Sequence, residues 1–156
     1  MKLTSLIRPL AAALLSMAAL SAAAQQKLLP AQSDIAFVFK QMGVPVSGHF
    51  KKFDAQISFD TAKPATNKVA FTVDIASATL GSPEPDAELP KSVWFNTAKF
   101  PQATFVSSSF KPLGAGKYEV AGKLSIKGQS QEVVVPLTMV QAGAVTTVTG
   151  AFPIQR

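Results

Sequence analysis

The residues best suited to catalysis or metal binding are three carboxylates, Glu84, Asp86 and Glu88, which stand at every second position in the stretch SPEPDAELP. Carboxylates this close in sequence could hold a divalent cation or supply a general acid and base. In the first turn of a helix, however, such residues more often interact with the helix dipole and maintain solubility. We therefore predict neither a metal site nor a catalytic residue among them.

Other reactive residues give no better basis for catalysis. The single histidine, His49, lies in a lysine-rich stretch and is expected on the surface rather than as a base. Ser107–Ser109 have no histidine partner and no nucleophile-elbow glycines, and Gly114–Gly116 lack the GK[ST] of a phosphate loop. The chain has no cysteine and hence no thiol chemistry. We predict no enzymatic activity and no cofactor, apart from a bound lipid.

The first residues indicate export. Lys2 and Arg8 precede an apolar stretch that ends in Ser-Ala-Ala-Ala, which is typical of a signal peptide over residues 1–24, with a membrane anchor as the alternative. The remaining residues, 25–156, suit one domain and are expected in the periplasm. The chain has 15 Lys and Arg against 9 Asp and Glu, but the lysines are scattered as on a solvated surface.

Alternating apolar and polar residues predict strands almost everywhere, and no long amphipathic helix appears. We expect an all-β fold of about eight strands, as a barrel or a sandwich. Phenylalanines interspersed with very small inward residues favour the barrel, and they leave open whether it encloses a cavity or is filled. The clearest predicted strands cover residues 33–40, 53–60, 68–75, 103–110, 118–126 and 132–139.

One segment, residues 82–105, interrupts this pattern. Ser82-Pro83 resembles a helix start, and Leu89-Pro90 ends the helix after little more than a turn. Trp94, Phe95 and Phe100 follow. A short helix with an aromatic tail between two strands would act either as a lid at one end of the barrel or as an apolar seal with nothing bound.

Four stretches together resemble the YceI family of exported lipid-binding proteins. The segment 33–44 looks like the opening strand of the family, and Gly48–Asp54 is similar to its G-x-F-x-x-F element. Residues 86–105 resemble the family's helical insert and the strand after it. Gly122–Gly128 matches G-x-L-T-I-K/R-G. The resemblance covers nearly all of the chain after residue 24.

The resemblance implies an extended, lipocalin-like antiparallel barrel whose apolar tunnel holds a polyisoprenoid or an isoprenoid quinone. On this basis the inward strand positions would line the tunnel, and Leu89, Trp94 and Phe95 of the insert would gate it. A register slip of one residue would reverse every face. The predicted lining residues are Phe37, Phe39, Phe50, Ile57, Phe59, Phe71, Val73, Phe105, Leu124 and Ile126.

Two departures from the family pattern concern the head group and barrel closure. Many members carry a histidine and an R-D-x-H-L element where this chain has Gln41, Pro85 and Glu88. Asp86 and Glu88 are therefore the predicted head-group contacts, accepting a hydrogen bond from a hydroxyl or quinol. The family also continues through a closing strand beyond the position of Arg156. A fragment or a shortened form with an unpaired sheet edge is expected.

This form of the insert resembles a subgroup joined to, or encoded beside, cytochrome b561-type membrane proteins, which favours a quinone-like guest. The predicted function is binding and carriage of a polyisoprenoid or isoprenoid quinone in the periplasm. The alternative is a non-enzymatic interaction module with a filled barrel, partnering such a membrane protein. A homodimer is a further partnership to test. Nucleic acid is not an expected partner, because the chain looks exported and lacks a basic stripe.

Overall fold

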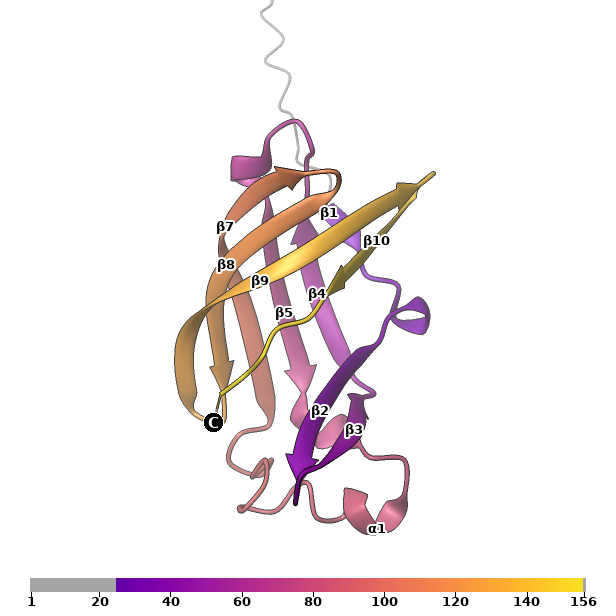
Figure 1. Ribbon diagram of the computed structural model, residues 1–156, viewed down its shortest axis with the longest axis vertical. Coiled ribbons are helices and arrows are strands. Elements are labelled where there is room, and N and C mark those ends of the chain that lie inside the picture. The colour runs from indigo at the N-terminus through magenta and orange to yellow at the C-terminus, as the bar shows by residue number, and fades with distance from the viewer. Residues whose placement is uncertain (1–24, 156) are drawn as a thin grey trace, which may run out of the picture.

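The computed structural model describes residues 25–155, and the predicted signal peptide lies outside them. The alternating pattern produces antiparallel strands that form two sheets (Figure 1). In spatial order, the larger sheet contains β1 (Gln25–Lys27), β4 (Phe53–Ser58), β5 (Lys68–Asp74), β7 (Gln102–Gly114), β8 (Lys117–Ile126), β9 (Gln129–Ala142) and β10 (Val145–Gly150).

The smaller sheet lies at the lower end of the molecule in Figure 1, beside the only α-helix among the described residues. No helix within residues 25–155 is long and apolar enough to cross a bilayer. The smaller sheet contains β2 (Ile35–Gln41), β3 (Val44–Phe50) and β6 (Ala78–Thr79). The helices are η1 (Pro30–Gln32), η2 (Pro64–Thr66), η3 (Ile75–Ser77), all of the 3-10 type, and α1 (Pro83–Asp86).

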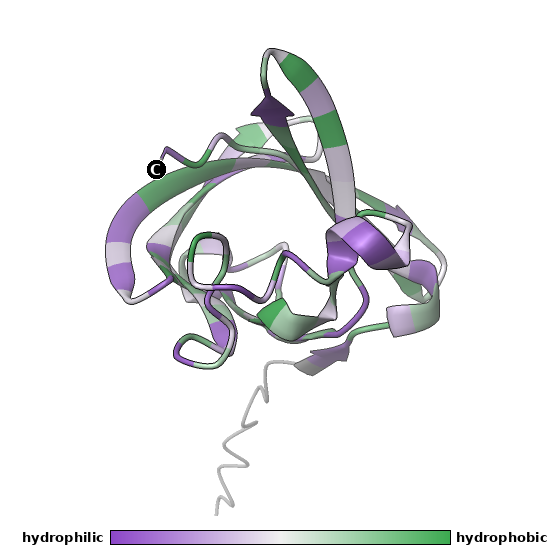
Figure 2. Ribbon diagram, turned by 90° about the horizontal axis from the view of Figure 1, so that it is seen from below, coloured by the Kyte–Doolittle hydropathy of each residue, from purple (hydrophilic) through white to green (hydrophobic). Residues whose placement is uncertain are grey.

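The larger sheet curls into a half-barrel, as the view along the barrel in Figure 2 shows. The long strands β7, β8 and β9 cross it obliquely, and the β9–β10 hairpin extends away from the curl. The all-β, lipocalin-like antiparallel architecture with one short helical insert is thus confirmed. The described residues form ten strands rather than about eight, because short pairings such as β1 and β6 carry no alternating signal of their own.

A buried apolar cluster lies toward the end of the half-barrel away from α1. Val69, Phe110 and Val120 form its centre, and Val120 is fully buried. These residues come from β5, β7 and β8, which are neighbours in the sheet, so their inward side chains meet on its concave face. Six half-buried side chains surround them: Ile57, Phe71, Phe105, Tyr118, Leu137 and Met139.

Strand β7 contains a bulge that changes which residues point inward. Ser107 pairs with Gly122 and Ser109 with Ala121, so one extra residue sits between them on β7. The hydroxyl of Ser107 accepts a hydrogen bond from the backbone N–H of Val69 at 2.9 Å. The bulge places Phe110 on the concave face, whereas strict alternation from Phe105 would point it outward.

The two margins of the larger sheet differ. At one margin, the side-chain amide of Gln26 donates to the carbonyl of Phe59 and accepts from its N–H, both at 2.9 Å. This amide extends the β1–β4 pairing by imitating a peptide group. At the other margin, all six residues of β10 are exposed, and no further described strand pairs with its outer edge.

Candidate functional site

Five aromatic rings gather where the β2–β3 hairpin meets the insert, residues 80–101. Phe37 lies 4.9 Å from Phe50 and 5.9 Å from Phe95, centroid to centroid. Phe39 lies 5.4 Å from Trp94 in an edge-to-face arrangement. All five side chains are half-buried. We call this set, Phe37, Phe39, Phe50, Trp94 and Phe95, the insert-end cluster.

The hairpin presents its aromatic residues because of its register and its turn. Met42 and Gly43 form a two-residue turn with φ of 52° and 84°, the positive values that tight hairpins require. The register that follows places Phe37 opposite Gly48 and Phe39 opposite Val46. Phe37 and Phe39 therefore share one face and stack loosely at 6.3 Å.

The insert is anchored to β6 by Asp86. Helix α1 begins as predicted, with Ser82 as its N-cap and Pro83 in its first turn. The carboxylate of Asp86 accepts a hydrogen bond from the backbone N–H of Leu80 at 2.5 Å and one from the hydroxyl of Thr79 at 2.6 Å. These bonds, the one from Leu80 first, hold the pKa of Asp86 below its ordinary value of 3.8.

Two further contacts hold the rest of the insert. The ammonium group of Lys127, in the β8–β9 turn, donates to the carbonyls of Trp94 at 2.6 Å and Ser92 at 3.3 Å. Leu89 is 3% exposed, and its carbonyl accepts from the N–H of Phe95 at 3.0 Å. The insert is thus fastened to both sheets, and two of its three predicted gate residues lie in the insert-end cluster.

The predicted head-group residues have protein partners in this structure. Asp86 binds Leu80 and Thr79 as described, and Glu88 forms an exposed ion pair with Lys91 at 2.5 Å. A lipid hydroxyl that used either carboxylate would compete with these bonds. Their role as head-group contacts stays a prediction.

The other predicted lining residues lie farther along the concave face. Ile57, Phe71 and Phe105 pack on the buried cluster around Val120. Phe59 meets Tyr118 at 5.6 Å and Phe110 at 6.5 Å, although β5 and β7 separate β4 from β8. Rings from non-adjacent strands can meet only across the inside of the curl. We call Phe59, Phe110 and Tyr118 the far-end cluster.

The three remaining predicted residues lie on β5 and β8. Leu124 is buried and pairs with Phe105, while Val73 pairs with Phe53 and Ala103. Ile126 is half-buried at the end of β8. The structure also adds inward residues that the sequence-based set lacked, Phe110, Tyr118, Leu137 and Met139. For Phe110, the one sequence signal of its inward direction is the run of serines before it, where a bulge can form.

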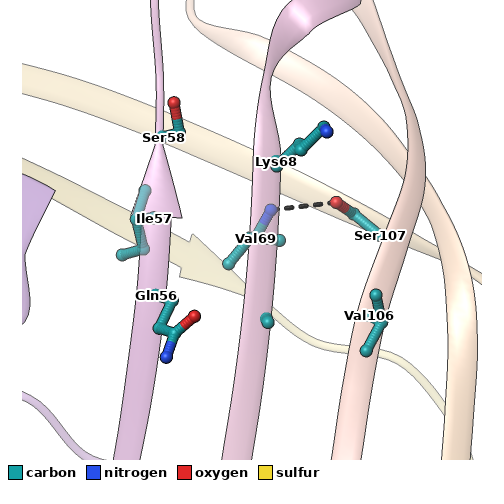
Figure 3. Close-up of a pocket in the computed structure, with 8 residues that line it drawn as sticks. Gln56, Ile57, Ser58, Lys68, Val69, Val106 and Ser107 are labelled. Carbon is teal, nitrogen blue, oxygen red and sulfur yellow. Dashed lines mark hydrogen bonds between the residues drawn. The ribbon is translucent and has the colours of Figure 1, made fainter. Parts of the chain in front are cut away.

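One hollow lies elsewhere, between β4, β5 and β7 (Figure 3). It has a volume of about 360 Å³, and Ile57 is its only residue from the predicted lining set. Exposed polar side chains such as Gln56 and Lys68 border it, so it is unsuited to a long apolar chain. The apolar surface of interest is the open concave face rather than this hollow.

No arrangement for metal chemistry is present within residues 25–155, where no three His, Asp or Glu side chains gather closely enough to hold an ion. His49 is on the surface, as expected, with its side chain 54% exposed. Its Nδ1 lies 2.9 Å from a carboxylate oxygen of Asp34. The histidine therefore has one acidic partner, in contact with solvent.

Comparisons with known proteins agree with this architecture. The model of the YceI-like domain matches residues 27–156. UPF0312 protein plu2095 of Photorhabdus laumondii is 37% identical over 136 residues, which is 85% of this chain and 70% of that protein. The chain spans 50% of the length of other curated relatives that it matches.

Solved structures show the same fold. BcnA of Burkholderia cenocepacia is similar with a TM-score of 0.75 and 46% identity, over 78% of this chain and 76% of that chain. A polyisoprenoid binding domain from Saccharophagus degradans, implicated in plant cell wall breakdown, shares the fold, with a TM-score of 0.58 and 19% identity over 76% of this chain and 69% of its own. The chain therefore belongs to the family of YceI-like domains.

Proposed function

We propose that this protein binds and carries an isoprenoid lipid, a polyisoprenoid or an isoprenoid quinone, along the concave face of its half-barrel. Its role is then binding and delivery, without catalysis. The proposal extends to location: the signal peptide predicted over residues 1–24 would direct the chain to the periplasm. The mass of the exported protein tests this point, because cleavage before Gln25 predicts a chain that starts at that residue.

One observation carries the proposal: the aromatic residues of the concave face other than Phe110 are only half-buried. All five rings of the insert-end cluster keep contact with solvent, and so do Phe59, Phe71 and Phe105. A core filled by its own side chains would bury most of them, since phenylalanine is commonly found in protein interiors. An apolar guest would cover the area that the protein leaves open.

The free energy of lipid transfer indicates that the shape of the binding surface, rather than its hydrophobicity, decides which lipid binds. Burying a methylene group is worth about 0.8 kcal/mol relative to water. An isoprenoid in a bilayer is already buried, so its transfer to the protein gains little from the hydrophobic effect alone. Selection must therefore come from the form of the concave face and from the few polar groups near its end. The polyisoprenoid-binding domain of the same fold supports this class of ligand.

Native mass spectrometry and lipid extraction test the proposal on protein purified from its own periplasm. We expect a co-purifying isoprenoid or quinone, in a smaller amount for Trp94→Ala, because Trp94 contributes one wall of the insert-end cluster. A folded wild-type protein that carries no lipid would contradict carriage. The extracted lipid also separates the two ligand types, since a quinone absorbs light in the near ultraviolet and a saturated polyisoprenoid alcohol does not.

A second candidate function is an interaction module that carries no lipid and binds a membrane protein of the cytochrome b561 type. The exposed outer edge of β10 favours it, because free strand edges are templates for pairing with another chain. If this function holds, Thr146→Pro, which removes an N–H that points away from β9, should abolish co-purification with the membrane protein and leave the β9–β10 pairing intact. Retained co-purification in this variant would contradict pairing through β10.

A further inference from the structure

The tip of the Phe37 ring lies over its partner strand because position 48 has no side chain. Phe37 pairs directly with Gly48. A Cβ atom at position 48 would overlap Cζ of Phe37 and would lie 2.8 Å from both Cε2 of Phe37 and Cδ2 of Leu80. The ring therefore occupies the space in which another residue would carry its side chain. We call this space the Gly48 recess.

The larger sheet repeats the arrangement at Gly122. A Cβ atom there would lie 2.5 Å from Cζ of Phe105 and 2.5 Å from the carbonyl oxygen of Val106. Phe105 pairs with Leu124, so its ring reaches Gly122 diagonally, whereas Gly122 itself pairs with Ser107. The two recesses are on different sheets, and both seat a phenylalanine that belongs to the predicted lining set. In both places the absence of a side chain on the glycine leaves room for the tip of a large ring.

We propose that these two recesses set the width available to the lipid, and that Gly48 is the specificity-determining residue that admits a methyl-branched prenyl chain. This inference rests on the proposed function and names which shape of chain the concave face selects. The neighbours of the ring supply the mechanism. Phe37 already lies 4.9 Å from Phe50 and 5.9 Å from Phe95, so a ring displaced from the recess must move into the space that these residues border.

A narrower face would penalise branched chains more than straight ones. A prenyl chain carries a methyl group on every isoprene unit, whereas a linear alkyl chain of the same main-chain length is thinner. Pockets that are too small for one methyl group discriminate by about tenfold or more. Filling the Gly48 recess should therefore shift preference away from prenyl chains, without abolishing binding of linear chains.

Gly48→Ala is the direct test because the three atoms nearest to its added methyl group all belong to side chains. Gly122 is a poorer choice, since the carbonyl of Val106 would force the backbone to move. The probes are geranylgeraniol and hexadecanol, which share main-chain length and hydroxyl and differ in methyl branches and double bonds. Fluorescence of Trp94, the single tryptophan, reports binding.

The wild type should prefer geranylgeraniol, and Gly48→Ala should lower the ratio of the two affinities by about tenfold. Adding Phe37→Leu to this variant should restore the ratio, because the smaller side chain leaves room for the methyl group. Phe37→Leu alone provides the baseline for this comparison. Ser47→Ala, on the exposed face of the same strand, should leave the ratio unchanged.

Three results would overturn the inference. An unchanged affinity ratio in Gly48→Ala, or an equal loss for both alcohols, would show that the recess does not select for branching. A double variant that stays as selective as Gly48→Ala would show that the ring of Phe37 is not the cause. A folded wild type that binds neither alcohol would instead remove the proposed function, and this inference with it.

Discussion

The ring of Trp94 meets the ring of Phe39 edge to face, with 5.4 Å between centroids and 67° between planes. This contact joins the insert to the first hairpin, two segments that are far apart in the chain. It also closes one side of the insert-end cluster. The insert is therefore held in place partly by a contact within the insert-end cluster, which is also the surface proposed to bind the lipid.

Replacing Trp94 should weaken this junction. We expect Trp94→Ala to lower the free energy of unfolding by about 1 kcal/mol through the lost ring pair, beyond the lost buried area. Trp94→Phe should retain most of this amount, because a phenylalanine ring can still meet Phe39 by its edge. Urea denaturation followed by circular dichroism measures both. Equal stability of all three proteins would show that the contact has no energetic role.

Asp86 should make stability depend on acidity. Its pKa is lowered in the folded state, so its contribution is present at neutral pH and is lost as pH falls through the lowered pKa. Asp86→Asn, which cannot accept both bonds from Leu80 and Thr79, should be less stable at neutral pH. The difference from wild type should shrink as the pH falls below the ordinary pKa of 3.8 and through the lowered pKa of the folded state. Denaturation over a pH series measures this difference in unfolding free energy, and Glu84→Gln is the control on the same helix. A difference between Asp86→Asn and wild type that stays constant with pH would contradict the prediction.

Val120 should be the most sensitive aliphatic position of the barrel. Because its side chain is fully buried in a cluster with Val69 and Phe110, Val120→Ala should cost about 2 kcal/mol in unfolding free energy. Val134→Ala is the matched control, since Val134 lies on the next strand and is 58% exposed, and it should stay within about 0.5 kcal/mol of wild type. Similar losses of unfolding free energy in both variants would contradict a core centred on Val120.

Lys127 should control how readily the insert opens. Lys127→Asn removes the bonds to the carbonyls of Trp94 and Ser92, and asparagine tolerates the positive φ of 48° at this position. We expect opening of the insert to become easier by about 1 kcal/mol, which is a several-fold rise in amide exchange over residues 82–100. Lys123→Asn, on the exposed face of β8, should leave exchange in the insert unchanged. A rise confined to the β8–β9 turn would contradict the clamp.

Much of the architecture followed from the sequence because period-two alternation and turn residues are local signals. The alternation in 53–60 and 68–75 predicted β4 and β5, and Ser82-Pro83 predicted the start of α1. The inward direction of Phe110 was not predictable in this way, since the bulge at Ser107–Ser109 breaks the alternation that the prediction uses. The sequence shows that a run of serines is present. It does not show that the hydroxyl of Ser107 accepts the hydrogen bond from the N–H of Val69 that a strand carbonyl would otherwise accept.

The predicted site residues divide into groups that only the three-dimensional structure distinguishes. Sequence placed Phe37 and Phe59 in one list, whereas they belong to clusters at different ends of the half-barrel. The partners of Asp86 could not be predicted from the sequence either, because only the fold of the backbone brings the N–H of Leu80 next to its carboxylate. Likewise, Gly48 is recognisable as a recess only once the β2–β3 register places Phe37 opposite it.

The unequal margins of the larger sheet have a consequence for symmetry. The margin at β1 is three residues long, while β10 offers six exposed and uncharged residues. Growth of a filament needs two complementary edges on each molecule, whereas one edge that pairs with its own copy closes after a single step. Self-association through β10 should therefore stop at a two-fold pair, with Thr147 near the rotation axis, and an endless fibre should not form.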